Sequence, residues 1–236
     1  MSTTGHRKDP AYWKAVADSA CVELADADAL ETLAWTARTF GDRWIVASSM
    51  QDALLIDLAV RVNPAVDVLF LQTGYHFPET LGTRDAVTVD YPRLRVIDAE
   101  PEQSVAEQEA AYGTLHRTDP GRCCQLRKVR PLRRALAGYD AWVTGIRRAD
   151  APTRADAPLV SWDERHGLVK VNPIAAWSDE RAERYLAERG VLRNPLVAEG
   201  YTSIGCAPCT TKPGPDDGPR GGRWAGLGKT ECGLHG

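Results

Sequence analysis

The sequence predicts an α/β protein built on a mainly parallel sheet that is flanked by helices. Three observations support this fold class. Short apolar segments rich in β-branched and aromatic residues alternate with segments whose apolar residues recur at helical spacing. The chain of 236 residues is long enough for one large α/β domain with attachments. Its composition, 43 % hydrophobic and 26 % charged, is typical of a globular protein and excludes wholesale disorder.

The expected elements follow one another in a regular alternation. Residues 1–20 are polar, and we expect them to be mobile. Residues 22–40 carry apolar residues at a loose helical spacing, which predicts a surface helix. Strands are expected at four apolar segments, Trp44–Ala47, Val66–Leu71, Leu94–Ile97 and Ala141–Ile146. Segments with helical spacing, such as Leu54–Val62, lie between them. This alternation favours parallel strands covered by helices.

The last third of the chain has different local patterns. Apolar runs at 159–162 and 168–171 flank a polar turn, which predicts a β-hairpin. Ser178 is a suitable N-cap for a helix that continues to Arg189 and ends at Gly190. Toward the end glycine and proline are frequent and apolar periodicity is lost. We therefore divide the chain into a polar segment at 1–20, an α/β domain at 21–209 and a mobile tail at 210–236.

Charge and hydropathy exclude several function classes. The chain has 29 basic and 32 acidic residues, so it lacks the basic excess of a bulk nucleic-acid binder. No apolar run reaches the roughly 18 residues that a membrane helix needs, and the polar N-terminus is unlike a secretory signal. We therefore expect a cytoplasmic protein with no nucleic-acid or membrane partner. Because thiols stay reduced in the cytoplasm, the six cysteines indicate metal or redox chemistry.

Four cysteines form two closely spaced pairs. Cys123 and Cys124 are adjacent, and Cys206 and Cys209 form a CxxC element. Four thiolates can close a tetrahedral zinc site or hold an iron–sulfur cluster, and the spacing does not decide between them. The adjacent pair converges on one centre only at a helix start or a tight turn. The basic residues that follow are Arg127, Lys128 and Arg130. Their charge would stabilise such an anionic centre. Cys21, in contrast, is expected to be a buried small hydrophobic residue.

A further cysteine, Cys232, lies close to the C-terminus. A cysteine at this position is rarely structural. Lys229 and His235 favour its thiolate, which is the nucleophilic form, whereas Glu231 opposes it. A cysteine on a mobile tail can also reach two partners in turn. From this local context, Cys232 is either a candidate nucleophile or a surface thiol without a function.

Hydroxyl-bearing, glycine and arginine residues gather in the loops after the predicted strands and near the tail. In chain order these candidates are Ser48, Ser49, Thr73, Gly74, Gly145, Arg147, Arg220 and Arg223. The first two lie in a strand-to-helix turn, where backbone N–H groups can bind a phosphate. The next four follow two other strands, at the edge where open parallel sheets bind ligands. Together they predict a site for an anionic ligand.

Three cysteine elements occur in one order along the chain, accompanied by three further phrases. The cysteine elements are Cys123-Cys124-x-x-Arg127-Lys128, Cys206-x-x-Cys209 and Glu231-Cys232-Gly233-Leu234-His235. The other phrases are Thr73–Thr80, Trp142–Arg148 and Gly222–Trp224. In these elements the chain, from about residue 40 to its end, resembles the assimilatory adenylyl-sulfate (APS) and phosphoadenylyl-sulfate (PAPS) reductases. Three independent cysteine elements make this resemblance specific.

The resemblance implies a nucleotide-binding fold related to the PP-loop pyrophosphatases and adenine nucleotide alpha hydrolases. It implies reduction of adenosine 5′-phosphosulfate to sulfite and AMP in sulfate assimilation, with electrons from thioredoxin. The implied nucleophile is Cys232, which would form an S-sulfocysteine intermediate. One 4Fe–4S cluster per chain is implied on Cys123, Cys124, Cys206 and Cys209. This ligand set favours APS over the 3′-phosphorylated substrate.

The remaining candidates receive roles from the same chemistry. Charge builds on the leaving phosphate and on the sulfonate oxygens, and cationic groups would stabilise it. The candidates for this role are Lys128, Arg220, Arg223 and His235. The candidates for substrate binding are Ser48, Ser49, Thr73, Gly74, Gly145 and Arg147.

Two departures from the family and two alternatives accompany this interpretation. Gln72 stands where relatives commonly have Asp, and the turn after the first strand lacks the glycines of the wider pyrophosphatase group. One alternative is a reductase that prefers or also accepts PAPS. The other is a zinc-stabilised PP-loop nucleotidylyltransferase, which would depend on ATP and would not need Cys232. A purely structural interaction protein would leave the tail unexplained. A homo-oligomer is compatible with the sequence.

Overall fold

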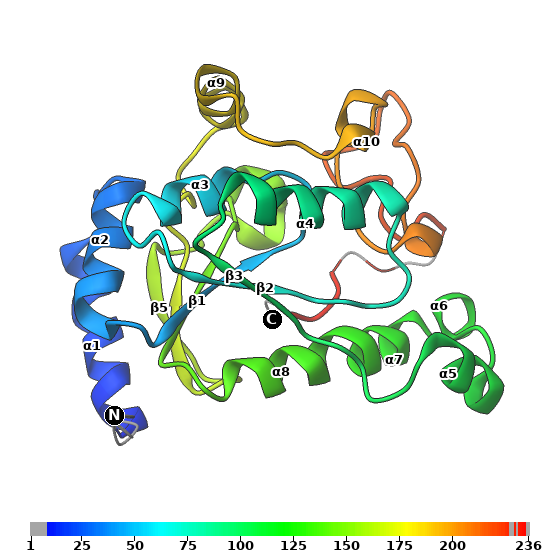
Figure 1. Cartoon of the computed structure of the whole chain (residues 1–236), viewed down its shortest axis with the longest axis horizontal. Coiled ribbons are helices and arrows are strands. Elements are labelled where there is room, and N and C mark those ends of the chain that lie inside the picture. Colours follow the sequence, from blue (N-terminus) through cyan, green and yellow to red (C-terminus); the bar gives the residue numbers. More distant parts are fainter. Residues whose placement is uncertain (1–8, 227–228, 230, 235–236) are drawn as a thin grey trace.

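A six-stranded sheet forms the centre of the molecule, in the order β3-β2-β1-β4-β6-β5 (Figure 1). The computed structural model describes residues 9–226, 229 and 231–234. The strands are β1 (Trp44–Ser48), β2 (Asp67–Phe70), β3 (Arg95–Asp98), β4 (Ala141–Thr144), β5 (Val160–Asp163) and β6 (Leu168–Val171). Each neighbouring pair is parallel except β5 and β6, which are antiparallel. The predicted fold class and the predicted hairpin are therefore confirmed.

The strand order reverses at β1, and this reversal places the candidate site. β1 pairs with β2 on one side, where Ser48 is opposite Phe70, and with β4 on the other, where Ala47 is opposite Thr144. The loops that follow these three parallel strands therefore leave the sheet at the same edge. In open α/β sheets, ligands bind at the carboxyl edge where the strand order reverses.

Helices cover both faces of this sheet (Figure 1). The α-helices are α1 (Pro10–Glu23), α2 (Ala29–Phe40), α3 (Leu54–Val60), α4 (Pro78–Asp90), α5 (Val105–Tyr112), α6 (Leu115–Thr118), α7 (Pro120–Cys124), α8 (Arg130–Leu136), α9 (Asp179–Arg189) and α10 (Pro195–Ala198). The short η elements are η1 (Gln125–Val129), η2 (Arg148–Asp150), η3 (Pro152–Arg154) and η4 (Ala207–Cys209).

The apolar core divides into two clusters, one on each face of the sheet. Successive residues of a strand point to opposite faces. In β1, Val46 belongs to the larger cluster together with Leu33 of α2 and Leu58 of α3. Its neighbour Ile45 belongs to the smaller cluster, with Leu132 of α8. Both sides of each central strand are therefore buried away from solvent, which explains the continuous apolar runs in the sequence.

The structure differs from the mobile segment expected at residues 1–20, because residues 10–23 form α1. The Asp9 side chain caps this helix, and a proline occupies its first turn, where a missing N–H costs nothing. Trp13, Ala17 and Ala20 recur at helical spacing and are buried, and α1 packs on β5. Cys21 follows this buried stripe and is exposed, so its predicted burial is wrong.

Helix caps explain the other boundaries. The surface helix expected at 22–40 is divided, since α2 begins after Asp28, whose side chain and Glu31 form a capping box. The predicted helix from Ser178 to Arg189 is confirmed, and Gly190 ends it in a left-handed conformation.

After η4, the described residues form no further helix or multi-residue strand. Within the described part of the chain, no helix combines the length and apolar character needed to span a membrane.

A helical rod runs from α7 through η1 to α8 below the sheet (Figure 1). Its middle part, η1, is a π-helix, a rare geometry that is often found at functional sites. The Asp119 side chain caps the rod by accepting a hydrogen bond from the Arg122 amide at 2.9 Å. The adjacent cysteines lie in the first turn and a half of this rod, and η1 directs Arg127 and Lys128 into the protein, where both are buried.

Candidate functional site

A cavity of about 770 Å³ opens at the carboxyl edge of the sheet. Its lining combines residues of the β1, β2 and β4 loops, of η1 and of the C-terminal segment. Of the residues predicted for the site, it includes Ser48, Ser49, Thr73, Lys128, Gly145, Arg147, Cys206, Arg220, Arg223 and Cys232. The fold therefore brings together candidates that are as much as 184 positions apart in the sequence numbering, from Ser48 to Cys232. Gly74 is not part of the lining, and His235 lies outside the described residues.

The turn after β1 is held by its own polar groups. Met50 is fully buried with a positive φ of 58°, and its amide donates to the Ser48 hydroxyl at 3.2 Å. The Asp52 side chain accepts a hydrogen bond from the amide of Leu54, the first residue of α3, at 3.0 Å. Burial raises the pKa of Asp52. The predicted Ser48 and Ser49 both line the cavity at this turn.

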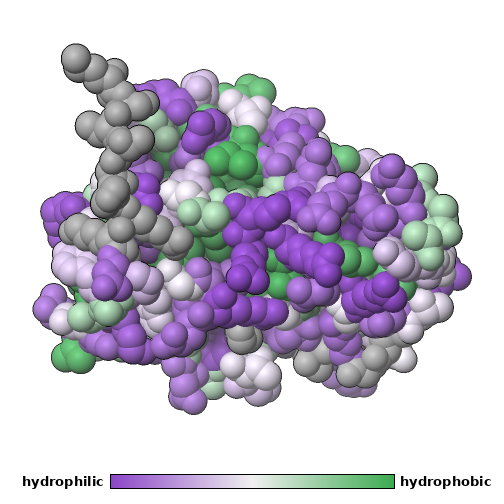
Figure 2. Space-filling view, turned by 90° about the horizontal axis from the view of Figure 1, so that it is seen from below, coloured by the Kyte–Doolittle hydropathy of each residue, from purple (hydrophilic) through white to green (hydrophobic). Residues whose placement is uncertain are grey.

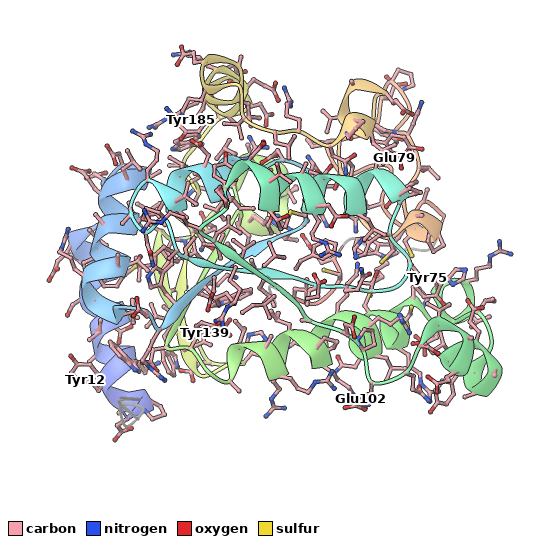
Figure 3. All side chains as sticks on the ribbon, in the orientation of Figure 1. Tyr12, Tyr75, Glu79, Glu102, Tyr139 and Tyr185 are labelled. Atoms are coloured by element: carbon pink, nitrogen blue, oxygen red, sulfur yellow. The ribbon has the colours of Figure 1, made fainter. Side chains whose placement is uncertain are left out.

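A buried arginine organises the turn after β2. Arg127 donates to the backbone oxygen of Thr73, to the Gln103 oxygen at 3.2 Å and to the Gln108 side chain at 3.1 Å. Its guanidinium also lies 5.2 Å from the ring centre of Tyr75, which Figure 3 shows near α6. From the sequence, Arg127 is expected only to stabilise charge near the cysteines. The structure shows that it also joins the β2 turn to α5.

Gly74 fits against this arginine rather than into the cavity. Its φ is 77°, and a Cβ atom would lie 2.7 Å from Val105 and 3.0 Å from Arg127. The Gln72 side chain accepts the Gly74 amide at 3.1 Å. Gly74 has a structural role in this turn, since only glycine fits this crowded left-handed position, and its contact with the substrate stays a prediction. Gln72 takes part in the same turn.

Four free thiols approach one another between the rod and η4. Cys123, Cys124 and Cys206 are buried and Cys209 is half-buried. Burial raises the pKa of Cys123 to about 11, and the charges of the other three thiols add to this effect. Burial also raises the pKa of Cys209, and the charges of Cys206 and Cys124 add to this effect. Two segments separated by more than 80 positions thus present their sulfur atoms to a common region.

The spacing of these sulfurs bears on what they can hold. Among the described residues, no three or more His, Cys, Asp or Glu side chains are gathered closely enough for a single metal ion. Tetrahedral zinc would need thiolate sulfurs about 3.8 Å from one another, given its bond length to sulfur. The ligands of an iron–sulfur cluster stand farther apart because the cluster lies between them. A donor set of four thiols and no histidine suits either a structural zinc ion or an iron–sulfur cluster.

Lys128 is the cation at the centre of this region. It is only 8 % exposed. Burial alone would lower its pKa, but the sulfurs of Cys206, Cys232 and Cys124 raise the pKa above its ordinary value. Conversely, Lys128, together with the Thr73 hydroxyl 3.3 Å away, lowers the pKa of Cys206 against the effect of burial. Lys128 therefore lies between the cysteine pairs and Cys232.

The three arginines predicted for the anion site have different surroundings. Arg147 is held between Asp150 at 2.9 Å and Asp179 at 2.7 Å. Arg220 contacts the Glu231 carboxylate at 3.3 Å. These two arginines line the cavity while paired with carboxylates of the same chain.

Arg223 is held in place by several contacts within the protein. It donates to the Ser203 hydroxyl at 3.3 Å and to the Ile204 oxygen at 3.2 Å. Its guanidinium lies 4.6 Å from the ring centre of Trp224, which is buried. A Cβ atom at Gly205 would lie 2.1 Å from the guanidinium. Arg223 thus fastens the C-terminal segment to the backbone directly before Cys206, in addition to lining the cavity.

The C-terminal segment carries Cys232 to the cavity. Glu231 forms an ion pair with Arg154 at 2.9 Å, and the Gly233 oxygen accepts a hydrogen bond from Arg165. Leu234 packs on the smaller core cluster, the one beneath the sheet. Figure 1 shows this segment, in red, on the α8 side of the sheet. Figure 2 views the molecule from this side, where the surface is largely hydrophilic and the apolar areas are scattered.

Comparison with known proteins gives a consistent set of relatives. Residues 43–212 match the family model of the phosphoadenosine phosphosulfate reductase domain. The chain is 61 % identical over 221 residues to adenosine 5′-phosphosulfate reductase of Mycolicibacterium smegmatis, with 93 % of each chain covered. It is 58 % identical to the protein of the same name from Streptomyces coelicolor, with 94 % of each chain covered.

Solved structures resemble this fold as well. Phosphoadenylyl-sulfate reductase of Candida auris, in a phosphate complex, superposes with a TM-score of 0.69 at 27 % identity, covering 81 % of this chain and 94 % of its own. An FMN adenylyltransferase of Candida glabrata superposes with a TM-score of 0.55 at 13 % identity, covering 86 % and 74 %. The second likeness concerns the fold alone.

Proposed function

Because the chain belongs to the phosphoadenosine phosphosulfate reductase domain family, we propose that it reduces adenosine 5′-phosphosulfate to sulfite and AMP in sulfate assimilation. Relatives about 60 % identical over nearly the whole chain carry the name of this activity. The observation that carries the proposal is the position of Cys232, which lines one cavity with Lys128 and Arg220. A thiol and two cations in a single cavity suit an anionic electrophile.

The first half-reaction transfers the sulfonate group to the enzyme. The Cys232 thiolate attacks the sulfur of the sulfate group, and the bond from that sulfur to the bridging phosphate oxygen breaks. AMP leaves with the electron pair, and Cys232 becomes an S-sulfocysteine. Lys128 and Arg220 compensate the negative charge that moves onto the leaving phosphate and the sulfonate oxygens. We assign the same role to Arg223 and His235.

The second half-reaction uses thioredoxin as the electron donor. One thioredoxin thiolate attacks Cys232 at its sulfur, sulfite leaves, and a mixed disulfide forms. The second thioredoxin thiol then resolves this disulfide and frees Cys232. Two electrons pass from the thioredoxin dithiol to the sulfonate sulfur, which leaves as sulfite. Cys232 therefore needs access first to the cavity and then to a protein partner.

We propose that the four thiols of α7 and η4 hold one 4Fe–4S cluster per chain, through Cys123, Cys124, Cys206 and Cys209. The supporting observations are the all-thiol donor set and a buried Lys128, which requires nearby negative charge. When bound, the cluster would supply a fixed anionic centre that ties two segments together. Lys128 would then compensate this charge on the side that faces Cys232.

The substrate's adenosine and phosphate groups are assigned to the cavity residues after β1, β2 and β4. These residues are Ser48, Ser49, Thr73, Gly145 and Arg147. The four-cysteine set favours APS over PAPS. We also propose that the protein acts in the cytoplasm and that the segment from 210 carries the nucleophile as a tail attached to the 21–209 domain.

Sulfite release from iron-loaded protein with thioredoxin tests this function. We expect release from APS at a much higher rate than from PAPS, and none from Cys232→Ser. Equal rates would extend the substrate range to PAPS. The zinc-stabilised nucleotidylyltransferase predicts instead bound zinc, ATP turnover and full activity of Cys232→Ser, and that combination would replace the reductase.

A further inference from the structure

The carboxylate directly before the proposed nucleophile is held by two arginines. Arg154 binds Glu231 in a forked arrangement, from Nε to Oε1 and from Nη2 to Oε2, both at 3.1 Å. Arg220 reaches the same carboxylate with one hydrogen bond, from Nη2 to Oε2 at 3.3 Å. Forked arginine–carboxylate pairs are stronger and more directional than single contacts. Glu231 is therefore attached mainly to Arg154 and more weakly to Arg220.

Arg154 itself is held in place by a second carboxylate, that of Asp150. Its Nη1 atom donates to Asp150 at 3.2 Å, and Asp150 also accepts from Arg147 at 2.9 Å. Arg147 in turn pairs with Asp179 at the start of α9. The Arg154 side chain is only 12 % exposed. A row of alternating charges therefore fixes the guanidinium before the tail binds, which lowers the entropic cost of holding Glu231.

Arg220 has two possible anionic partners. It is a proposed partner for the anionic substrate, and it contacts Glu231 in the structure without substrate. A bound phosphosulfate carries more negative charge than one carboxylate and competes for this guanidinium. Since Arg220 contributes only one hydrogen bond to Glu231, it can be released while the fork to Arg154 remains intact.

We propose that Arg154 is a positioning residue that anchors Glu231, and thereby holds Cys232 in the cavity while Arg220 turns to the anionic part of the substrate. This inference rests on the proposed function and concerns a residue that no sequence motif singled out. Neighbouring residues of a chain move together, so an anchor at Glu231 restrains the adjacent Cys232. Leu234, packed beneath the sheet, restrains the other side. Release of the fork would be the step that exposes Cys232 to a reducing protein.

The decisive experiment measures how accessible Cys232 is, without substrate, in the iron-loaded protein under anaerobic conditions. Iodoacetamide alkylation of Cys232 is followed by peptide mass analysis. We expect Arg154→Met and Glu231→Gln to be alkylated about tenfold faster than the unmodified protein, since each loses a charge-assisted fork. Arg154→Lys should restore part of the protection, because it keeps the charge but not the fork. Arg184→Met, which removes an exposed α9 arginine outside the cavity, is the matched control and should match the unmodified rate.

Two further measurements separate positioning from substrate binding and from stability. Single-turnover formation of the Cys232 adduct at saturating APS should slow about tenfold in Arg154→Met, while the Kd for AMP changes by less than about twofold. In Arg220→Met the Kd for AMP should rise. Urea midpoints of Arg154→Met and Arg184→Met should agree. Unchanged alkylation in Arg154→Met, or a rise in its Kd for AMP equal to that of Arg220→Met, would overturn the anchor.

Failure of this proposal and failure of the proposed function are distinguishable. Alkylation of Cys232 needs no substrate, so its protection by Arg154 can be measured whatever reaction the protein catalyses. If the unmodified protein forms no adduct with APS, the function is wrong and the alkylation arm still decides the anchor. If the adduct forms and the alkylation rates do not change, only the anchor is wrong.

Discussion

Lys128 is a buried residue that lies close both to the cysteine pairs and to Cys232. A buried ammonium group is costly unless negative charge lies close to it. Cys206, Cys232 and Cys124 are the groups that raise its pKa against burial. The lysine stays charged because these sulfurs lie close to it, and its charge in turn lowers the pKa of Cys206 against the effect of burial. Lys128 therefore interacts electrostatically with both cysteine pairs and with Cys232, the proposed nucleophile.

Replacing Lys128 by Met should separate these contributions. Met preserves most of the volume and removes the charge, so we expect formation of the Cys232 adduct with APS to slow by about 10²-fold. Single-turnover mass analysis of iron-loaded protein measures the rate. An unchanged rate in a variant that retains its iron would show that Lys128 is only structural.

Replacement of Gly74 should lower the stability of the protein. Gly74→Ala places a Cβ 2.7 Å from Val105 at a positive φ, so we expect a loss of about 1–3 kcal/mol in the free energy of unfolding. Gly82→Ala is the matched control, because it lies within α4 with open space around it and should gain up to about 1 kcal/mol. Urea unfolding measures both. A Gly74→Ala variant as stable as the parent would contradict the crowding.

At the scale of elements, Asp57 joins three helices on the side of the sheet opposite the tail. This α3 residue accepts hydrogen bonds from Tyr91 at 3.2 Å and Tyr185 at 2.6 Å and pairs with Arg189 at 2.7 Å. Figure 3 shows Tyr185 below α9. Burial would raise the pKa of Asp57, but these partners outweigh it and hold the pKa below its ordinary value. The network fixes α9, whose first turn supplies Asp179 to the cavity.

This lowered pKa predicts a pH dependence of stability. The folded protein binds a proton at Asp57 less tightly than the unfolded chain does. The stabilisation is therefore complete above the unfolded pKa of about 4 and is lost as the pH falls through and below that value. Urea midpoints between pH 6 and about 3 should fall less steeply for Asp57→Asn than for the parent. Parallel slopes would show that Asp57 does not contribute, and a variant with higher stability at pH 6 would contradict the network.

Elements differ in how far local sequence determines them. Strands β1 to β4 and the 160–171 hairpin were predictable because each is built from short apolar runs bounded by turn residues. Helix α9 was predictable from Ser178 and Gly190, whose roles are local. Helix α1 was missed because its buried stripe consists of one tryptophan and small alanines within a polar background. The π-helix η1 has no local signature, since tertiary contacts of Arg127 and Lys128 hold its geometry.

At the scale of the whole molecule, the site is assembled across the sheet. The four cysteines proposed as cluster ligands come from two distant segments, and the proposed nucleophile comes from a third. The motifs could be found in the sequence because each is compact, and their family resemblance linked them. The contacts between them were not predictable, because the pairs Glu231–Arg154, Arg127–Thr73 and Arg223–Ile204 join residues whose proximity depends on strand order. Gly74 and Arg223 accordingly acquired structural roles only in the folded molecule.

Iron removal should act on this assembly as a whole. If one cluster joins α7 to η4, chelation under anaerobic conditions should lower the Tm and increase amide exchange in residues 203–211 far more than in the central strands. Differential scanning calorimetry and hydrogen exchange of the same preparation measure the two effects. Cys209→Ser should resemble the iron-free parent in both. Equal Tm values before and after complete iron removal would contradict a joining role.

The central claim is that Cys232 takes the sulfonate group from APS, and one measurement tests it most directly. Iron-loaded protein is incubated anaerobically with APS, and in parallel with PAPS, in the absence of thioredoxin, and its peptides are analysed by mass. We expect the Cys232 peptide to gain one SO₃ group from APS while AMP is released in equal amount. No such gain from either nucleotide, in protein shown to retain its iron, would contradict the account.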